Sequence, residues 1–250
     1  MNPRITVITP CYNSIQFIES CIKNIRDQKC KEVEHLIMDG GSTDGSLEII
    51  QKYVKEYSHI RYVSAPDNGQ SDAMNKGIKL AKGQIISFLN VDDGYFTFVL
   101  KRVIALFNAN SSLNFIAGNC KLFDLKGNLL YINRPQRLKS YHIYSSLEPF
   151  PINPAAYFYK KELHDKIGYY NVENHYNMDL EFILKAIVKV NIIYFNEDWG
   201  YMIQHELAKT SLDDDIEFRK KELIKNFQQH LTFTQKQTVL AYKIFKLIWK

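Results

Sequence analysis

The sequence predicts an α/β fold in which a mostly parallel central sheet carries helices on its faces. Up to about residue 125, short apolar runs alternate with stretches whose apolar residues recur at helical spacing. The apolar runs end abruptly at Pro, Asn or Asp, which are typical of the loops between strands and helices. Strands that alternate with helices in this way pair in parallel through right-handed crossovers.

Two strand–helix units open the chain. Residues 5–9 form a β-branched run that Pro10 ends, and helically spaced isoleucines follow. Residues 35–38 form a second apolar run that ends at Asp39 and a glycine-rich loop, and the apolar residues of 47–57 again share one helix face. We therefore expect two parallel strands whose carboxyl ends carry polar loops.

Three further strands and two helices continue the alternation. The strands are expected at residues 60–65, 85–89 and 115–120, and the helices at residues 71–82 and 98–108. Gly83 is expected in the C′ position that ends the first of these helices. The run at 85–89 stops at Asn90, Asp92 and Asp93, so a buried strand ends in a cluster of oxygen atoms.

After residue 120 the pattern changes. The elements expected there are, in order, a hairpin over 121–132, a mobile loop over 133–154, a strand over 155–159 and a short helix over 161–167. A longer helix begins near Met178 and Asp179. Asp179 therefore lies in a first turn, where the helix dipole stabilises its charged form.

Composition narrows the class of protein. The 250 residues, 46% of them hydrophobic, suffice for a large folded domain, and the 32 Lys and Arg are spread among 27 acidic residues. No nucleic-acid partner is expected from this distribution. The cysteines form no Cys-x-x-Cys pair, which predicts free thiols in a reducing compartment, the cytoplasm; they are Cys11, Cys21, Cys30 and Cys120. No apolar run reaches the ~20 residues of a membrane span, and no secretion leader is recognisable.

Three loops at strand carboxyl ends carry candidate functional residues. In a parallel sheet these loops meet at one crevice, where ligands bind. They hold Tyr12 with Asn13, Asp39, and Asn90 with Asp92 and Asp93. An aromatic ring can stack on a base, and carboxylates with a divalent cation can hold a diphosphate. The alternatives are a turn acid for Asp39 and a core aromatic for Tyr12. Gly-x-Gly-x-x-Gly and P-loop patterns are absent, which disfavours NAD, FAD and P-loop chemistry.

Four motifs together resemble those of family 2 glycosyltransferases with the GT-A fold. They are PxYN at 10–13, DGGSTD at 39–44, DAMNKG at 72–77 with AxG at 81–83, and FLNxDD at 88–93. The resemblance is dense over residues 5–125 and looser through Asn153-Pro154-Ala155 and Met178-Asp179-Leu180-Glu181 to His205 and Ser211. It implies a nucleotide-sugar-binding half at 1–125, an acceptor-binding half with the catalytic base at 126–210, and a helical tail at 211–250.

The resemblance implies an inverting transferase that uses Mg²⁺ or Mn²⁺ and moves a sugar from a nucleoside-diphosphate donor to a hydroxyl of a glycan or glycolipid. The setting implied is cell-surface polysaccharide synthesis. We prefer UDP as the nucleotide because Asp39 could accept from the uracil imide, but thymine offers the same imide and dTDP stays open.

Site roles follow by position in the resemblance. Pro10, Tyr12 and Asp39 would hold the nucleoside, and Asp72 would lie near base and ribose. Asp92 is the expected metal ligand, since Asn90 replaces the first acid of the family's Asp-x-Asp motif. The residues expected to bind the donor or its cation are Pro10, Tyr12, Asn13, Asp39, Gly69, Asp72, Asn90, Asp92, Asp93 and His205. Lys209 is a further candidate. Asp179 is the expected catalytic base, preferred over Glu181 on another helix face; a plain dipole partner is the alternative.

Other interpretations stay open from the sequence. A sugar nucleotidyltransferase would also use an α/β nucleotide domain, a glycosidase would need two carboxylates, and an inactive nucleotide-sugar-binding homologue would suit Asn90. The tail from residue 218 onward could form a basic amphipathic helix with the apolar face Leu240, Ile244, Leu247 and Ile248. Such a helix can lie on an anionic membrane surface, on the inner face of the membrane for a cytoplasmic protein. Packing against the core or against a second copy, as in a homodimer, is the alternative.

Overall fold

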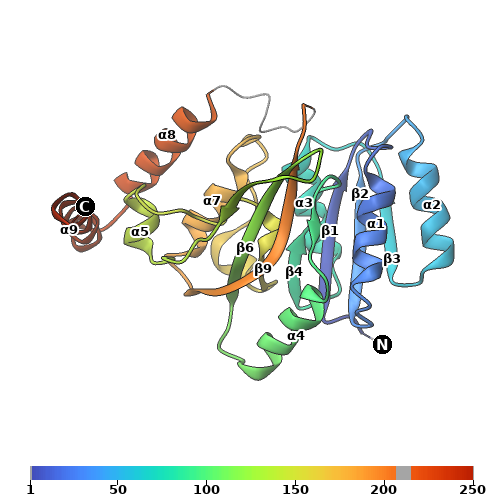
Figure 1. Cartoon of the computed structure of the whole chain (residues 1–250), viewed down its shortest axis with the longest axis horizontal. Coiled ribbons are helices and arrows are strands. Elements are labelled where there is room, and N and C mark those ends of the chain that lie inside the picture. The colour runs from blue at the N-terminus through green and yellow to red at the C-terminus, as the bar shows by residue number, and fades with distance from the viewer. Residues whose placement is uncertain (1, 207–214, 250) are drawn as a thin grey trace.

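The computed structural model describes residues 2–206 and 215–249. Within these residues, one mixed sheet has the strand order β3-β2-β1-β4-β8-β6-β9-β5, and β7 pairs with β6. The strands are β1 Ile5–Cys11, β2 Val33–Asp39, β3 Ile60–Ser64, β4 Ile85–Phe88, β5 Gly94–Tyr95, β6 Phe115–Asp124, β7 Leu129–Asn133, β8 Tyr157–Lys160 and β9 Ile192–Gln204. The sheet runs through the middle of the molecule (Figure 1). The predicted α/β class is confirmed.

Helices cover both faces of the sheet. The α-helices are α1 Ile18–Asp27, α2 Ser46–Glu56, α3 Gln70–Leu80, α4 Val99–Ala109, α5 Ser140–Tyr144, α6 Leu163–Ile167, α7 Met178–Ala186, α8 Ile216–Gln229 and α9 Phe233–Ile248. Alternate residues of β1 divide between two cores: Ile8 packs with α3 and α7, whereas Ile5 and Val7 pack with α1 and α4. This division follows from the two-residue period of a strand and places one core on each side of the sheet.

The first four strands match the predicted parallel pattern. β2 pairs in parallel with β1 and β3, and β1 pairs in parallel with β4. β1, β2 and β4 are buried along nearly all of their length, as parallel strands covered on both faces require, whereas the edge strand β3 buries only Ile60. Their carboxyl ends therefore lie along one edge of the sheet, where the loops of the candidate site begin.

The second half of the sheet is less parallel than predicted. β8 lies antiparallel between β4 and β6, and β9 runs parallel to β6 over much of its length. β9, β5 and α5 were not predicted. Polar residues Asn196, Glu197 and Asp198 interrupt the apolar pattern of β9, and its register against β6 shifts at bulges near Asn119. Sequence periodicity therefore could not identify the longest strand.

Gly83 has a different role from the one predicted. α3 ends at Leu80 with Ala81 as C-cap, so Gly83 is not the C′ residue. Its backbone N–H donates to Thr6 Oγ1 at 2.8 Å, and a Cβ at this position would lie 2.5 Å from the Thr6 nitrogen. Glycine is needed because the loop into β4 crosses directly over the start of β1.

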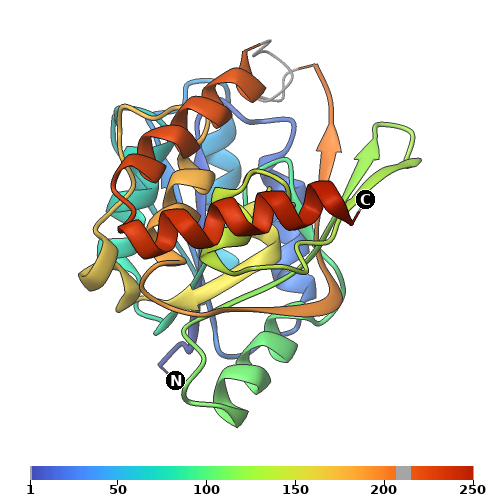
Figure 2. The ribbon, with the colours of Figure 1, turned by 90° about the vertical axis from the view of Figure 1, so that its left-hand side faces the viewer.

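The C-terminal helices lie at the far side of the molecule from α2 (Figure 1). α8 packs on α7, and α9 packs on α5, which Figure 2 shows from that side. The predicted helical extension is thus present over its described part. In the described part of the chain, no helix combines the length and the apolar character that a bilayer crossing requires. All four cysteines are buried free thiols, as predicted.

Candidate functional site

Loops from both halves of the chain surround a cavity of about 910 Å³ at the carboxyl edge of the parallel strands. The loops after β1, β2, β3 and β4 form one side, and residues around 153, 176 and 202 form the other. The predicted site residues that line it are Pro10, Tyr12, Gly69, Asn90, Asp92, Asp93 and Asp179. Asn13, Asp39, Asp72 and His205 contact these residues or their loops without lining the cavity themselves.

Tyr12 and Asp67 both lie close to Gly40. Tyr12 is 64% exposed, so its ring is available for stacking. A Cβ on Gly40 would lie 2.8 Å from Asp67 Oδ2 and 3.3 Å from the Tyr12 ring. Glycine at position 40 therefore lets both side chains lie directly against this loop, where a larger residue would displace them. Asn13 fixes the two loops to each other, since its Oδ1 accepts from the Thr43 N–H and its own N–H donates to Ser42 Oγ, both at 2.9 Å.

The Asp39 carboxylate is bound within its own loop. It is 1% exposed and accepts from the Gly41 N–H at 3.2 Å, from Ser42 Oγ at 2.5 Å and from Ser64 Oγ at 2.6 Å. These bonds shape the turn that carries Gly40 rather than presenting Asp39 to the cavity. Asp72 is likewise bound within its own segment, at the start of α3. It accepts from the Asn68 N–H and pairs with Lys76, and both contacts hold its pKa below the ordinary value.

Asn90, Asp92 and Asp93 lie together at the end of β4. Asn90 Oδ1 accepts from Gln70 at 2.9 Å, and its Nδ2 donates to Asp93 Oδ2 at 2.8 Å. Asn153 donates to the same Asp93 oxygen at 2.7 Å. Burial, and then the neighbouring charge of Asp92, raise the pKa of Asp93 to about 8. Burial beside Asp92 thus disfavours the ionised form of Asp93.

Asp92 pairs with His205, which comes from the end of β9. His205 Nε2 lies 3.0 Å from Asp92 Oδ2, and its ring stacks on Phe17 at 4.9 Å between centroids. His205 Nδ1 is buried and has no hydrogen-bond partner among the described residues. Between residues 2–206 and 215–249, no three His, Cys, Asp or Glu side chains group closely enough to hold a metal ion alone. One carboxylate and one imidazole nevertheless fit Mg²⁺ or Mn²⁺, which often take one or two protein ligands and complete their shell with substrate oxygens. Lys209, the further candidate, lies outside the described residues.

Asp179 lies in the first turn of α7, as predicted, and faces the same cavity. The Tyr157 hydroxyl donates to Asp179 Oδ1 at 2.6 Å. Tyr157 is fully buried, and burial followed by the charge of Asp179 raises its pKa well above the ordinary value. Glu181 is instead held by Lys185 at 2.6 Å and Asn174 at 2.8 Å. Of the two acids on α7, Asp179 is the one at the cavity.

Several lining residues were not predicted. They are Asp67, Gln70, Asn153, His175, Tyr176, Met202 and Ile203. Asp67 lies in the loop that follows β3, so the rule of polar residues at strand carboxyl ends could have found it. Met202 and Ile203 carry no such signal because β9 itself was not recognised.

Comparison with known proteins identifies relatives. The sequence profile described as "Glycosyl transferase family 2" matches residues 6–165. The uncharacterized glycosyltransferase EpsJ of Bacillus subtilis (strain 168) is 38% identical over 93 residues, which cover 37% of this chain and 27% of EpsJ. The GalNAc(5)-diNAcBac-PP-undecaprenol beta-1,3-glucosyltransferase of Campylobacter jejuni is 30% identical over 129 residues, or 51% of this chain and 41% of that enzyme. The matched regions thus span less than half of these relatives.

Solved structures share the fold over nearly the whole chain. S. aureus TarS 1-349 in complex with UDP-GlcNAc superimposes with a TM-score of 0.75 at 20% identity, covering 96% of this chain and 71% of that one. The mannosyltransferase PcManGT from Pyrobaculum calidifontis, in complex with GDP-Man and Mn²⁺, superimposes with a TM-score of 0.60 at 14% identity, covering 99% and 81%. At these identities the likeness establishes the fold, GT-A.

Proposed function

The chain belongs to glycosyl transferase family 2, and on that premise we propose that it is an inverting transferase acting on a nucleoside-diphosphate sugar. One observation carries the proposal. A single cavity is lined by the exposed Tyr12 ring, by Asp92, which pairs with His205, and by a separate carboxylate at Asp179. These are the groups needed to bind a base, hold a diphosphate and deprotonate an incoming hydroxyl.

The donor nucleotide is proposed to be UDP. The exposed Tyr12 ring suits stacking on a flat base. The structure of TarS contains UDP-GlcNAc or UDP, which supports a uridine donor, whereas the PcManGT complex contains GDP-Man. Asp39 is proposed to act through the loop that it orders, because its oxygens already accept three hydrogen bonds there.

Asp92 and His205 would hold the Mg²⁺ or Mn²⁺ ion. A bound ion would offset the negative charge that builds on the leaving nucleoside diphosphate. Asn90 and Asn153 keep Asp93 oriented beside this position, where it can contact the donor sugar. The orphaned Nδ1 of His205 is consistent with a ring that rearranges when the site is filled.

Asp179 is proposed as the base that removes the proton of the acceptor hydroxyl. One carboxylate on the side away from the leaving group suffices for an inverting displacement. The first turn of α7 places the carboxylate at the cavity, and the hydrogen bond from the Tyr157 hydroxyl fixes its orientation.

The acceptor is proposed to be a hydroxyl of a glycan or glycolipid, in a pathway for cell-surface polysaccharide at the cytoplasmic side. The printed names of relatives support this class: one is a chondroitin synthase and another acts on an undecaprenol-linked glycan. The family assignment leaves a sugar nucleotidyltransferase without support.

The test combines donor binding with turnover. Calorimetric titration with UDP-, dTDP- and GDP-sugars in Mn²⁺ should show binding of one nucleotide class, lost in Asp92→Ala or with EDTA. Asp179→Asn should bind the donor as the wild type does but lose turnover about 10²- to 10⁴-fold. Glu181→Gln, on the same helix, is the matched control and should keep turnover. Absence of nucleotide-sugar binding would refute the proposal, and an active Asp179→Asn variant would refute the assigned base.

A further inference from the structure

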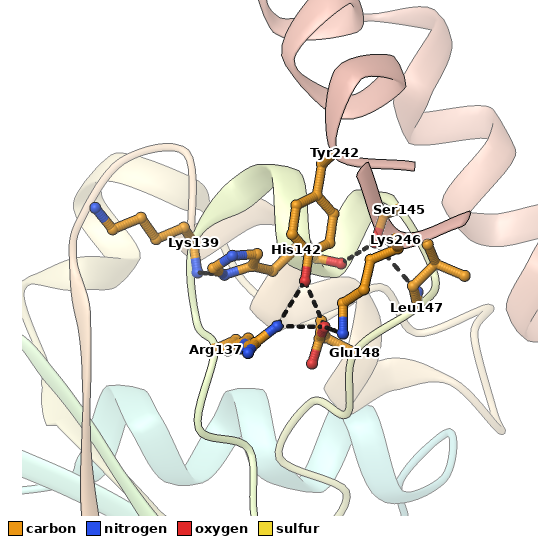
Figure 3. Close-up of polar contacts among 8 residues, drawn as sticks. All are labelled: Arg137, Lys139, His142, Ser145, Leu147, Glu148, Tyr242 and Lys246. Carbon is orange, nitrogen blue, oxygen red and sulfur yellow. Dashed lines mark hydrogen bonds and ion pairs between the residues drawn. The ribbon is translucent and has the colours of Figure 1, made fainter. Parts of the chain in front are cut away.

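The helix α9 is joined to the rest of the protein by the buried side chain of Val239 and by a polar cluster. Glu148 accepts an ion pair from Lys246 at 2.6 Å and one from Arg137 at 3.2 Å, and Tyr242 donates its hydroxyl to the same carboxylate (Figure 3). The Tyr242 ring also packs edge-on against His142 at 4.8 Å between centroids. Only 10% of the Glu148 side chain is exposed. The helix therefore has a fixed orientation on α5 and its following loop.

The opposite face of α9 is apolar and exposed. Its members are Phe233, Leu240, Ile244, Leu247 and Ile248, each between 48% and 77% exposed. Leu240 and Ile244 lie one turn apart, and Tyr242 lies midway between them in sequence and so on the other side of the helix. We call these five residues the outer stripe. Figure 2 shows α9 lying across the front of the molecule from that side.

All the charged side chains of α9 are positive. The helix contains Lys236, Lys243 and Lys246 and no Asp or Glu. Lys236 and Lys243 lie one turn before Leu240 and Leu247, so they border the stripe. Residues 216–250 contain eight Lys and Arg and two Glu, whereas the preceding residues contain 24 basic and 25 acidic side chains. The whole positive excess of the protein is thus in its C-terminal helices.

We propose that the outer stripe of α9 docks on an anionic lipid surface. Apolar side chains on one helix face enter the boundary between headgroups and acyl chains, and bordering lysines contact the lipid phosphates. A second copy of this chain is a poorer occupant, because self-pairing of α9 would bring lysines against lysines without an acidic partner on the helix. This docking is independent of the proposed sugar transfer, so either can fail alone.

The test is cosedimentation of the full chain with vesicles. The protein should bind vesicles of equimolar phosphatidylglycerol and phosphatidylcholine at low salt and bind pure phosphatidylcholine weakly, and high salt should release it. The double substitution Ile244→Glu with Leu247→Glu should abolish binding, and Lys236→Gln with Lys243→Gln should weaken it roughly thirtyfold. Because all four side chains lie on the surface, the fold should persist, which thermal unfolding checks.

The matched control is Leu129→Glu with Leu130→Glu on β7, which removes two apolar side chains of similar exposure (48% and 50%) from another surface. This control should bind as the wild type does. Equal loss in the control, or no binding to anionic vesicles, would overturn the proposal. A dimer in light scattering that the α9 substitutions convert to monomer, without vesicle binding, would also overturn it in favour of a second copy.

Discussion

Replacing Tyr157 with Phe removes one hydroxyl from beneath the proposed base. Tyr157 is fully buried, and its ring packs against Phe115 and Phe182. Phenylalanine keeps these ring contacts and deletes only the 2.6 Å hydrogen bond to Asp179. The substitution therefore tests how much the orientation of Asp179 depends on that bond.

The magnitude follows from the nature of the bond. A hydrogen bond to a charged group contributes about 1.5–3 kcal/mol. If Asp179 depends on it for orientation during proton removal, kcat should fall about 10- to 150-fold. Loss of the donor also makes the carboxylate bind its proton more tightly, which by itself would favour proton removal. A fall in kcat therefore reports lost orientation.

The assay is steady-state sugar transfer across pH. The KM for the donor should stay near that of the wild type, because Tyr157 does not line the cavity. The acidic limb of the kcat profile should move to higher pH, since the ionised form of Asp179 loses a stabilising donor. Tyr159→Phe is the control: Tyr159 is equally buried on β8, but its hydroxyl contacts His164 Nε2 at 2.9 Å. A Tyr157→Phe profile identical to wild type, or the same shift in Tyr159→Phe, would refute the reasoning.

Four further substitutions test the fold and the site. Gly83→Ala should lower the free energy of unfolding by about 2–3 kcal/mol in urea titrations, because the new Cβ meets the backbone of Thr6. Gly127→Ala is the control: its Cβ would lie in open space, so only its left-handed backbone conformation should cost stability, about 1 kcal/mol. Burial lowers the pKa of His35 to about 3. As the pH falls below 6.5, His35 therefore binds a proton in the unfolded chain but stays neutral in the folded chain. His35 should therefore cost about 2 kcal/mol of stability between pH 7 and pH 5, and His35→Gln should remove that part of the acid sensitivity in urea titrations. Asn90→Asp should lower the melting temperature, and Mn²⁺ should restore it, because a third carboxylate replaces the donor to Asp93; an unchanged melting temperature would contradict this.

The sequence was most informative where strands are buried on both faces. The runs that became β1, β2 and β4 contain few polar residues, so their type and approximate ends could be predicted. β9 could not, because its polar residues and bulges obscure the two-residue period. β5 has two residues, too few for any pattern. The order of the strands in the sheet could not be predicted from periodicity either, since β8 and β9 pair with strands that are distant in the sequence.

The same limit governs the site. The rule that loops meet at strand carboxyl ends placed Tyr12 and Asp92 at one cavity. The rule does not predict whether a carboxylate faces the cavity or its own loop. The Asp39 carboxylate faces its loop, where the Ser64 hydroxyl of β3 also donates to it. The sequence also gives no indication that Tyr157 belongs to the site, because its hydrogen-bond partner Asp179 lies on a separate element, α7.

The amide at Asn90 has a physical explanation in the arrangement around Asp93. Asp93 is 8% exposed, and its pKa is already raised by burial and by Asp92. An ionised carboxylate at position 90 could not donate to Asp93 and would add a further negative charge beside Asp92, whereas the amide donates to Asp93 and accepts from Gln70. With an amide at position 90, Asp92 is the acidic residue of this loop that contacts His205. An amide in place of the first acid can thus keep this site folded when no cation is bound to offset the charge of Asp92.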